Sequence, residues 1–227
     1  MREAVPVRCA TARCWPSRPH SGACRVAALD AAGMNQPSPL DIETRAGWPQ
    51  ELKLFLDQYP REVWPDHVNI AGMAAFLLEI HNGFRRAGEA LRGSTGEFRE
   101  GLVTPERFRS RYAPRLRTFL GHLEAHHTIE DHQMFPLFNA AEPRLMTGFE
   151  VLEKDHHVIH AAMERMAETA NVFMQTDAGD GDKMRFAAGA YADVGDRLMK
   201  MLDRHLGDEE DLVIPLILDR GEEGLGL

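Results

Sequence analysis

The chain has 227 residues, of which 44% are hydrophobic and 27% are charged, and its formal net charge at pH 7 is -9. This length and composition predict one sizeable globular core and exclude a wholly disordered chain. Residues 1–33 carry five Arg against Glu3 and Asp30, so the acidity belongs to the rest of the chain, and an acidic body without Lys/Arg clusters argues against nucleic acid and anionic membrane as partners.

Residues 1–48 are expected to form a poorly ordered N-terminal tail and linker, because proline and polar residues interrupt any apolar pattern there. All three cysteines of the chain fall in this segment and form no CxxC pair, which indicates a reducing cytoplasm and favours neither a disulfide framework nor a zinc site. No stretch of the sequence approaches the roughly eighteen apolar residues that a membrane span needs. The cysteines are Cys9, Cys14 and Cys24.

Residues 49–227 are expected to form one all-α domain. A short amphipathic piece at 52–59 comes first, and apolar residues then recur with a helical period along four long segments. We find no run of alternating β-branched residues that would indicate a sheet. The four helices are predicted at 66–91, 104–140, 147–175 and 182–219.

Start and stop signals define the ends of these helices. Gly93 and Gly96 are expected to end the first helix, and Thr104, followed by proline, to cap the second. Thr147 and Glu150 have the spacing of a capping box for the third helix. Because the connections are short, we expect an antiparallel up-down four-helix bundle with an N-terminal extension.

Histidine and glutamate residues recur along these helices at a constant displacement of 79 residues. Histidines that only fill a core are not expected to recur at a constant spacing in the two halves of a protein. Metal ligands contributed by two symmetric pairs of helices are expected to do so. The matched pairs are His81 with His160, His126 with His205, and Glu130 with Glu209.

Three of the helices carry two candidate ligands four residues apart, which places both side chains on one helix face, about 6 Å apart along the axis. Burying two glutamates would be very costly without positive charge nearby, so the pattern predicts a pair of metal ions inside the bundle. Imidazole and carboxylate donors without thiolates suit two irons, and manganese or zinc are less favoured. The candidate ligands are His81, His126, Glu130, His156, His160, His205 and Glu209.

Two further histidines follow directly after candidate ligands. His127 and His157 lie about 100° round the helix from their neighbours. We therefore expect each of them to face an adjacent helix or solvent.

The sequence around the candidate ligands resembles the hemerythrin-like, HHE cation-binding proteins, in particular their stand-alone bacterial members. The resemblance covers about residues 64–220. The motifs that carry it are LLEIH at His81, HHTIEDHQMFP at His126–Glu130, DHHVIH at His156–His160 and HLGDEEDLVIP at His205–Glu209.

The resemblance implies a division of the ligands between two irons. His156, His160 and His205 would hold one iron, and His81 and His126 the other. Glu130 and an acid on the fourth helix would bridge the two irons. The second iron would keep an open position, where dioxygen or another small diatomic ligand could bind.

The chain departs from the family pattern at the last carboxylate. Oxygen-carrying hemerythrins of animals place an aspartate five residues beyond the last histidine, whereas this chain has Glu210 there and Glu209 one residue earlier. Glu209 is favoured as the bridging acid because a regular helix puts it on the same face as His205. Glu210 would need a local π-bulge to reach that face.

Three functions are compatible with this sequence. The leading hypothesis is a non-haem diiron protein that binds or senses dioxygen, or nitric oxide, without turning over a substrate. The alternative is a diiron enzyme that removes nitric oxide or peroxide, or that repairs iron clusters. A third hypothesis is a module in which metal only completes the fold. The sequence leaves the oligomeric state open.

Overall fold

The computed structural model describes residues 38–177, 179 and 181–227. Residues 1–37, which contain the three cysteines, lie outside the described residues. The predictions for this part of the chain therefore stay predictions. Within the described part of the chain every regular element is helical, as expected for an all-α protein. None of the described helices has a stretch long and apolar enough to cross a membrane.

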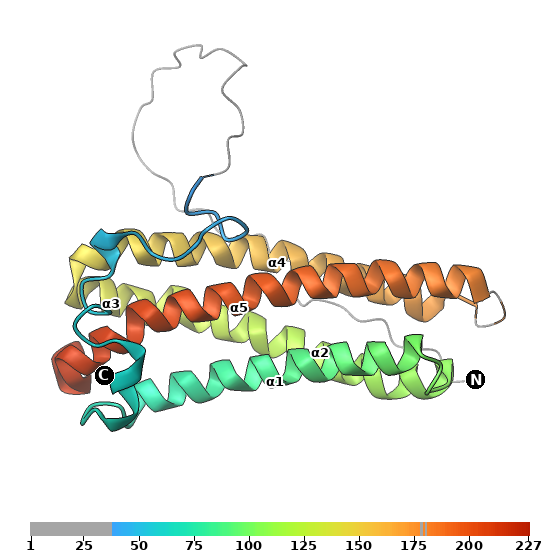
Figure 1. Ribbon diagram of the computed structural model, residues 1–227, viewed down its shortest axis with the longest axis horizontal. Helices are drawn as coiled ribbons and strands as arrows, with labels where there is room; N and C mark the ends of the chain where they lie inside the picture. The colour runs from blue at the N-terminus through green and yellow to red at the C-terminus, as the bar shows by residue number, and fades with distance from the viewer. Residues whose placement is uncertain (1–37, 178, 180) are drawn as a thin grey trace, which may run out of the picture.

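Long helices lie side by side and make up the body of the protein (Figure 1). The second of them, α2, continues through a π-helical turn, η3, into the short α3. Helix α5 packs against α1 and α4, and α2 packs against the same two helices, so that the inner faces of all of them meet. The elements are α1 (Met73–Arg99), α2 (Pro105–Ile129), η3 (Glu130–Met134), α3 (Phe135–Ala141), α4 (Met146–Gln175) and α5 (Gly181–Leu225).

Helix α1 is displaced towards the C-terminus relative to the sequence prediction. It begins at Met73, after a 3-10 turn at Arg61–Asp66 (η2) and Gly72, which has a φ of 75°. It then runs through Gly93 and ends at Arg99. A glycine inside a helix costs only about 1 kcal/mol relative to alanine, which the packing of the surrounding apolar residues outweighs.

The start of α4 also differs from the prediction. The capping box is wrong, because α4 begins at Met146 and no side chain caps it. The carboxylate of Glu142 instead accepts a hydrogen bond from the backbone N–H of Arg144 and starts a 3-10 turn at Pro143–Leu145 (η4) that leads directly into the helix. By contrast, Thr104 caps α2 as expected, by accepting a hydrogen bond from the N–H of Arg107.

The apolar core is divided into two clusters by a polar layer. On α1, Leu77 belongs to one cluster and Phe84 to the other, with His81 between them. The same change occurs around His156 on α4, between Leu152 and Ile159. His81 and His156 therefore lie at one level of the fold, with apolar side chains on both sides of them along the helices.

The segment before α1 packs against the helices, whereas its first part was expected to be a poorly ordered linker up to residue 48. Figure 1 shows it, in blue to teal, running past α4 and round the end of the helices where the C-terminus lies. Arg45 and Trp48 are buried. The Arg45 guanidinium pairs with Asp155 of α4 and Asp208 of α5, and the Trp48 indole donates to the carbonyl of Asp208.

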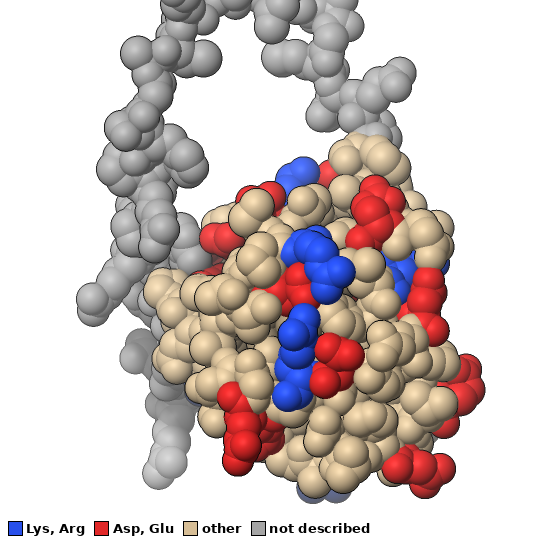
Figure 2. All heavy atoms as spheres, turned by 90° about the vertical axis from the view of Figure 1, so that its left-hand side faces the viewer, with Lys and Arg blue, Asp and Glu red and all other residues tan. Residues whose placement is uncertain are grey.

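Figure 2 looks onto the end of the molecule that carries the C-terminus. Lys and Arg side chains lie there beside Asp and Glu side chains, and no large patch of either sign appears on this face. A surface with interspersed charges of both signs gives little electrostatic attraction for a polyanion.

Candidate metal centre

Two groups of potential ligands lie in the polar layer, and they share one residue. His81, His126, Glu130 and Glu209 form the first group, and His127, Glu130, His156 and His205 form the second. In each group the four ligand atoms lie within 4.8 Å of one another, and all the residues are buried. The two groups therefore have the residue types and the spacing that a pair of metal ions would require.

Glu130 belongs to both groups and offers one carboxylate oxygen to each. Its Oε1 lies 2.9 Å from Nε2 of His126, and its Oε2 lies 3.5 Å from Nε2 of His156. Glu130 is the first residue of the π-helical turn that follows α2. A π-turn often occurs at functional sites.

Glu209 approaches the same space from α5. Its Oε2 lies 3.4 Å from Nε2 of His81 and 3.9 Å from Nε2 of His205. Glu210, the next residue, points elsewhere: its carboxylate contacts Nδ1 of His81 and the guanidinium groups of Arg61 and Arg85. Of the two adjacent glutamates, only Glu209 lies within the ligand groups.

Carboxylates face the outer nitrogen of three histidines. Glu210 Oε1 lies 3.0 Å from Nδ1 of His81, and Asp131 Oδ1 lies 2.8 Å from Nδ1 of His156. Asp155 Oδ2 lies 3.6 Å from Nδ1 of His205. A carboxylate at Nδ1 orients the ring and leaves Nε2 free to bind a metal ion. The sequence reasoning did not identify these three carboxylates.

The electrostatics of the layer agree with a site built for cations. Burial lowers the pKa of His81, but the carboxylates of Glu209 and Glu210 outweigh this effect and raise the pKa to about 9. Burial, and then the neighbouring charge of Glu209, raise the pKa of Glu130 well above its usual value. Burial also lowers the pKa of His126 to about 4, so its ring stays neutral and keeps a lone pair for a metal ion.

These residues fit a bound metal pair because many of their polar atoms are buried without a hydrogen-bond partner among the described residues. An unpaired buried polar group is costly and is rare in a folded protein. A metal ion would satisfy such atoms. They are Nε2 of His81 and His126, both ring nitrogens of His127, of which the ion would satisfy one, both carboxylate oxygens of Glu130 and Oε2 of Glu209. Nδ1 of His205 also lacks a hydrogen-bond partner, but it faces Asp155 and not the ligand groups.

The structure brings six of the seven candidate ligands into the two groups and leaves His160 outside them. His160 is half-buried, one helical turn beyond His156. His127, which the sequence did not include among the ligands, is fully buried and faces the adjacent helix α4, where its ring stacks on that of His156 with 4.0 Å between the centroids. His157 is exposed on the surface of α4.

A large cavity between α1 and α2 reaches the first ligand group. Its volume is about 1020 Å³, its lining is mostly apolar, and His126 and Glu130 form part of its wall. Phe76 of α1 and Ile129 of α2, which also line it, are exposed. An apolar molecule could therefore reach the ligand groups from the surface.

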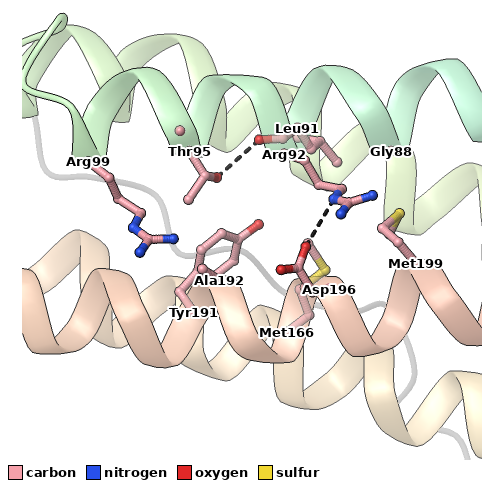
Figure 3. A pocket seen from close by; sticks show the side chains of 12 residues that line it. Gly88, Leu91, Arg92, Thr95, Arg99, Met166, Tyr191, Ala192, Asp196 and Met199 are labelled. Atoms are coloured by element: carbon pink, nitrogen blue, oxygen red, sulfur yellow. Dashed lines mark hydrogen bonds and ion pairs between the residues drawn. The ribbon is translucent and has the colours of Figure 1, made fainter.

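A second cavity, of about 220 Å³, lies between α1 and α5 and has no histidine in its wall (Figure 3). Arg92 and Asp196 form an ion pair of 2.9 Å at this cavity, and the hydroxyl of Thr95 donates to the carbonyl of Leu91. Thr95 lies about 21 Å along α1 from His81, at about 1.5 Å per residue. This cavity is therefore separate from the candidate metal centre.

Comparison with known proteins agrees with this geometry. No curated protein and no solved structure matches the chain. A family model does match: the hemerythrin HHE cation-binding domain, over residues 72–217. The match covers α1 to α5 as far as Ile217 and includes every residue of the two ligand groups. The chain therefore belongs to the hemerythrin HHE cation-binding domain family.

Proposed function

We propose that this protein is a non-haem diiron protein that binds or senses dioxygen, or a similar small diatomic ligand such as nitric oxide, at an open iron position. In this proposal the helices form an antiparallel up-down four-helix bundle, and each ligand group holds one iron. Imidazole and carboxylate donors suit iron as well as manganese and zinc, and we favour iron because the chain belongs to the hemerythrin HHE cation-binding domain family. We propose the cytoplasm as its location, because three cysteines without a CxxC pair do not make a disulfide framework.

The observation that carries the proposal is the position of Glu130. It is 2% exposed, it belongs to both ligand groups, and each of its oxygens faces a histidine of a different group. A carboxylate that serves two metal ions at once is what a metal pair needs, whereas a single structural metal ion would need only one of the groups.

The composition of the first ligand group supports an open coordination position on the iron that it would hold. This group contains two imidazoles, whereas the second group contains three. The apolar cavity meets the first group at His126 and Glu130, so an apolar gas has a route to it while the lining disfavours water. Two bound irons would supply the coordination position for the diatomic ligand and the electrons that hold it there.

The test is optical. Protein loaded with iron in air should contain close to two irons per chain and show absorption bands that change reversibly when oxygen is removed. A His126→Ala variant should lose this response, while His132→Ala, which alters an exposed histidine of the same region, should keep it. A spectrum of the iron-loaded protein that is indifferent to both oxygen and nitric oxide would contradict the proposal.

A second candidate function is an enzyme that removes nitric oxide or peroxide, or repairs iron clusters, at the same metal pair. The apolar cavity that leads from the surface to His126 and Glu130 favours it, because nitric oxide or peroxide could enter and small products could leave by the same route. Catalytic consumption of nitric oxide or peroxide that disappears in His126→Ala would establish this function. Stoichiometric binding without turnover would exclude it.

A further inference from the structure

We propose that His127, and not His160, completes the second ligand group and binds its metal ion. This inference rests on the proposed function, since it assumes that the two groups hold a metal pair. It assigns a ligand that the symmetric pattern of the sequence does not contain.

The position of the His127 ring carries the inference. One of its nitrogens lies within 4.8 Å of ligand atoms of Glu130, His156 and His205. The ring is nearly parallel to that of His156, at an interplanar angle of 13°, and stands edge-on to that of His205, with 5.4 Å between the centroids. The residue is 0% exposed, so no water from bulk solvent competes for these nitrogens.

Both ring nitrogens of His127 also lack a hydrogen-bond partner among the described residues. A histidine that only served to pack the core would normally find a partner for at least one nitrogen. His81 and His156, for comparison, each have a carboxylate at Nδ1. A metal ion in the second group would satisfy a nitrogen of His127 that nothing else in its surroundings satisfies.

His160 is less well placed for the same role. It is half-buried and belongs to neither ligand group. Its ring centroid lies 5.5 Å from that of His127, at an interplanar angle of 44°. His160 therefore neighbours His127 at the edge of the layer, where solvent reaches it.

The geometry of α2 explains how one helix can supply both groups. Consecutive residues point about 100° apart, so His126 and His127 flank the inner face of α2. His126 reaches the group that contains His81, and His127 reaches the group that contains His156. Glu130, one turn further on, serves both groups.

The test compares three single variants with the wild-type protein: His127→Leu, His160→Leu and, as a matched control, His157→Leu. His157 follows His156 in the chain as His127 follows His126, but it is exposed. Metal-free protein is titrated anaerobically with Fe²⁺, and separately with Co²⁺, whose absorption spectrum changes when the coordination number or geometry of the ion changes. We expect two ions per chain for the wild-type protein, His157→Leu and His160→Leu. In His127→Leu the second ion should bind at least tenfold more weakly.

Two results would overturn the inference. One is a His127→Leu variant that binds both ions with unchanged affinity and an unchanged cobalt spectrum. The other is loss of an ion in His160→Leu, whatever His127→Leu does. A wild-type protein that binds no metal pair would instead contradict the proposed function, so the two failures are distinguishable.

Folding of the variants is checked by far-UV circular dichroism of the metal-free proteins. If His127→Leu does not fold, His127→Gln keeps a polar side chain and still removes the imidazole. A crystal structure of the wild-type protein with Zn²⁺ provides a measurement without any variant. A zinc–nitrogen distance of about 2.0–2.1 Å to His127 supports the inference, and that distance to His160 overturns it.

Discussion

Arg45 should contribute more to the stability of this protein than any exposed arginine, although it lies outside the long helices. Its side chain is 0% exposed and forms ion pairs of 2.5 Å with Asp155 and 2.8 Å with Asp208. It also donates to the carbonyl of Leu40. An Arg45→Met variant would keep most of the apolar stem but leave two buried carboxylates without their counter-ion.

The expected loss follows from that burial. Removing one partner of a buried ion pair typically costs about 3–5 kcal/mol, because the remaining charge stays buried and uncompensated. For a chain of this size each 1 kcal/mol lowers the melting temperature by roughly 2–4 °C. The metal-free Arg45→Met variant should therefore melt roughly 6–20 °C below the wild-type protein in a thermal unfolding experiment followed by circular dichroism.

Arg204 provides the control. It faces the same Asp208 at 4.0 Å, but its side chain is 40% exposed, so Arg204→Met should cost less than about 1 kcal/mol. A triple variant that adds Asp155→Asn and Asp208→Asn to Arg45→Met should recover much of the lost stability, because no charge then remains unpaired. Equal melting temperatures for Arg45→Met and Arg204→Met would show that the buried ion pairs of Arg45 contribute no more than an exposed one.

Three further predictions concern the metal centre, the acid range and the backbone. Glu210→Gln should weaken metal binding about 10- to 100-fold in a chelator competition while two ions still bind, because Glu210 orients an imidazole and lies outside the ligand groups; unchanged affinity would contradict this role. Hydrogen bonds from Arg144 and Arg220 hold the pKa of Glu142 at about 2 in the folded protein, below the ordinary value of about 4.5 for a glutamate. The stabilisation that this charge provides is therefore present above pH 4.5 and lost as the pH falls towards 2. In urea unfolding at pH 7, Glu142→Gln should be about 1 kcal/mol less stable than the wild-type protein, a small loss because both arginines are about half exposed to solvent. This difference in stability should narrow below pH 4.5. A difference that stays constant with pH would exclude the charge effect. Gly72→Ala should cost about 1–3 kcal/mol, because φ is +75° and the new Cβ would meet the carboxylate of Glu222, whereas Gly93→Ala, where the space is open, should be neutral or stabilising in the same assay.

The sequence predicted the long helices well but not their ends. Period-3.6 patterns extend over many residues, and each residue adds to the signal, so the existence of α1, α2, α4 and α5 followed directly. The ends depend on a few residues and on what packs beside them. Gly93 was expected to end α1, yet the helix continues past it, and the chain turns only at Gly101, where φ is +74°.

The packing of residues 38–48 could not be predicted from local patterns. Arg45 finds its partners 110 and 163 residues further along the chain. The pattern of residues within the segment does not indicate such contacts. The stabilisation comes from pairing one buried arginine with carboxylates on two helices that are distant in the sequence. Prolines and polar residues therefore indicated a linker where the structure has a packed segment.

The 79-residue repeat of the sequence predicted some members of the ligand groups and missed His127. His81, His126 and His205 stood out because each has a counterpart 79 residues away. His127 has no such counterpart, since the matching position is Leu206, which is buried in the core. Whether a residue 100° from a ligand faces the site depends on how α2 is rotated against α4, and only the packed structure fixes that rotation.

The adjacent residues Glu209 and Glu210 of α5 differ in their position relative to His205. The helix is α-helical from His205 to Glu210, so Glu209 lies on the face of His205 and Glu210 lies about 100° away. The π-helical turn of this structure occurs at Glu130–Met134 and not on α5, and nothing on α5 brings Glu210 round to the ligand groups. Glu210 instead contacts the outer nitrogen of His81 and is itself held by Arg61 and Arg85. An acid five residues beyond the histidine is thus present in the chain, but its position suits it to orient a ligand, while the acid four residues beyond has the position of a ligand.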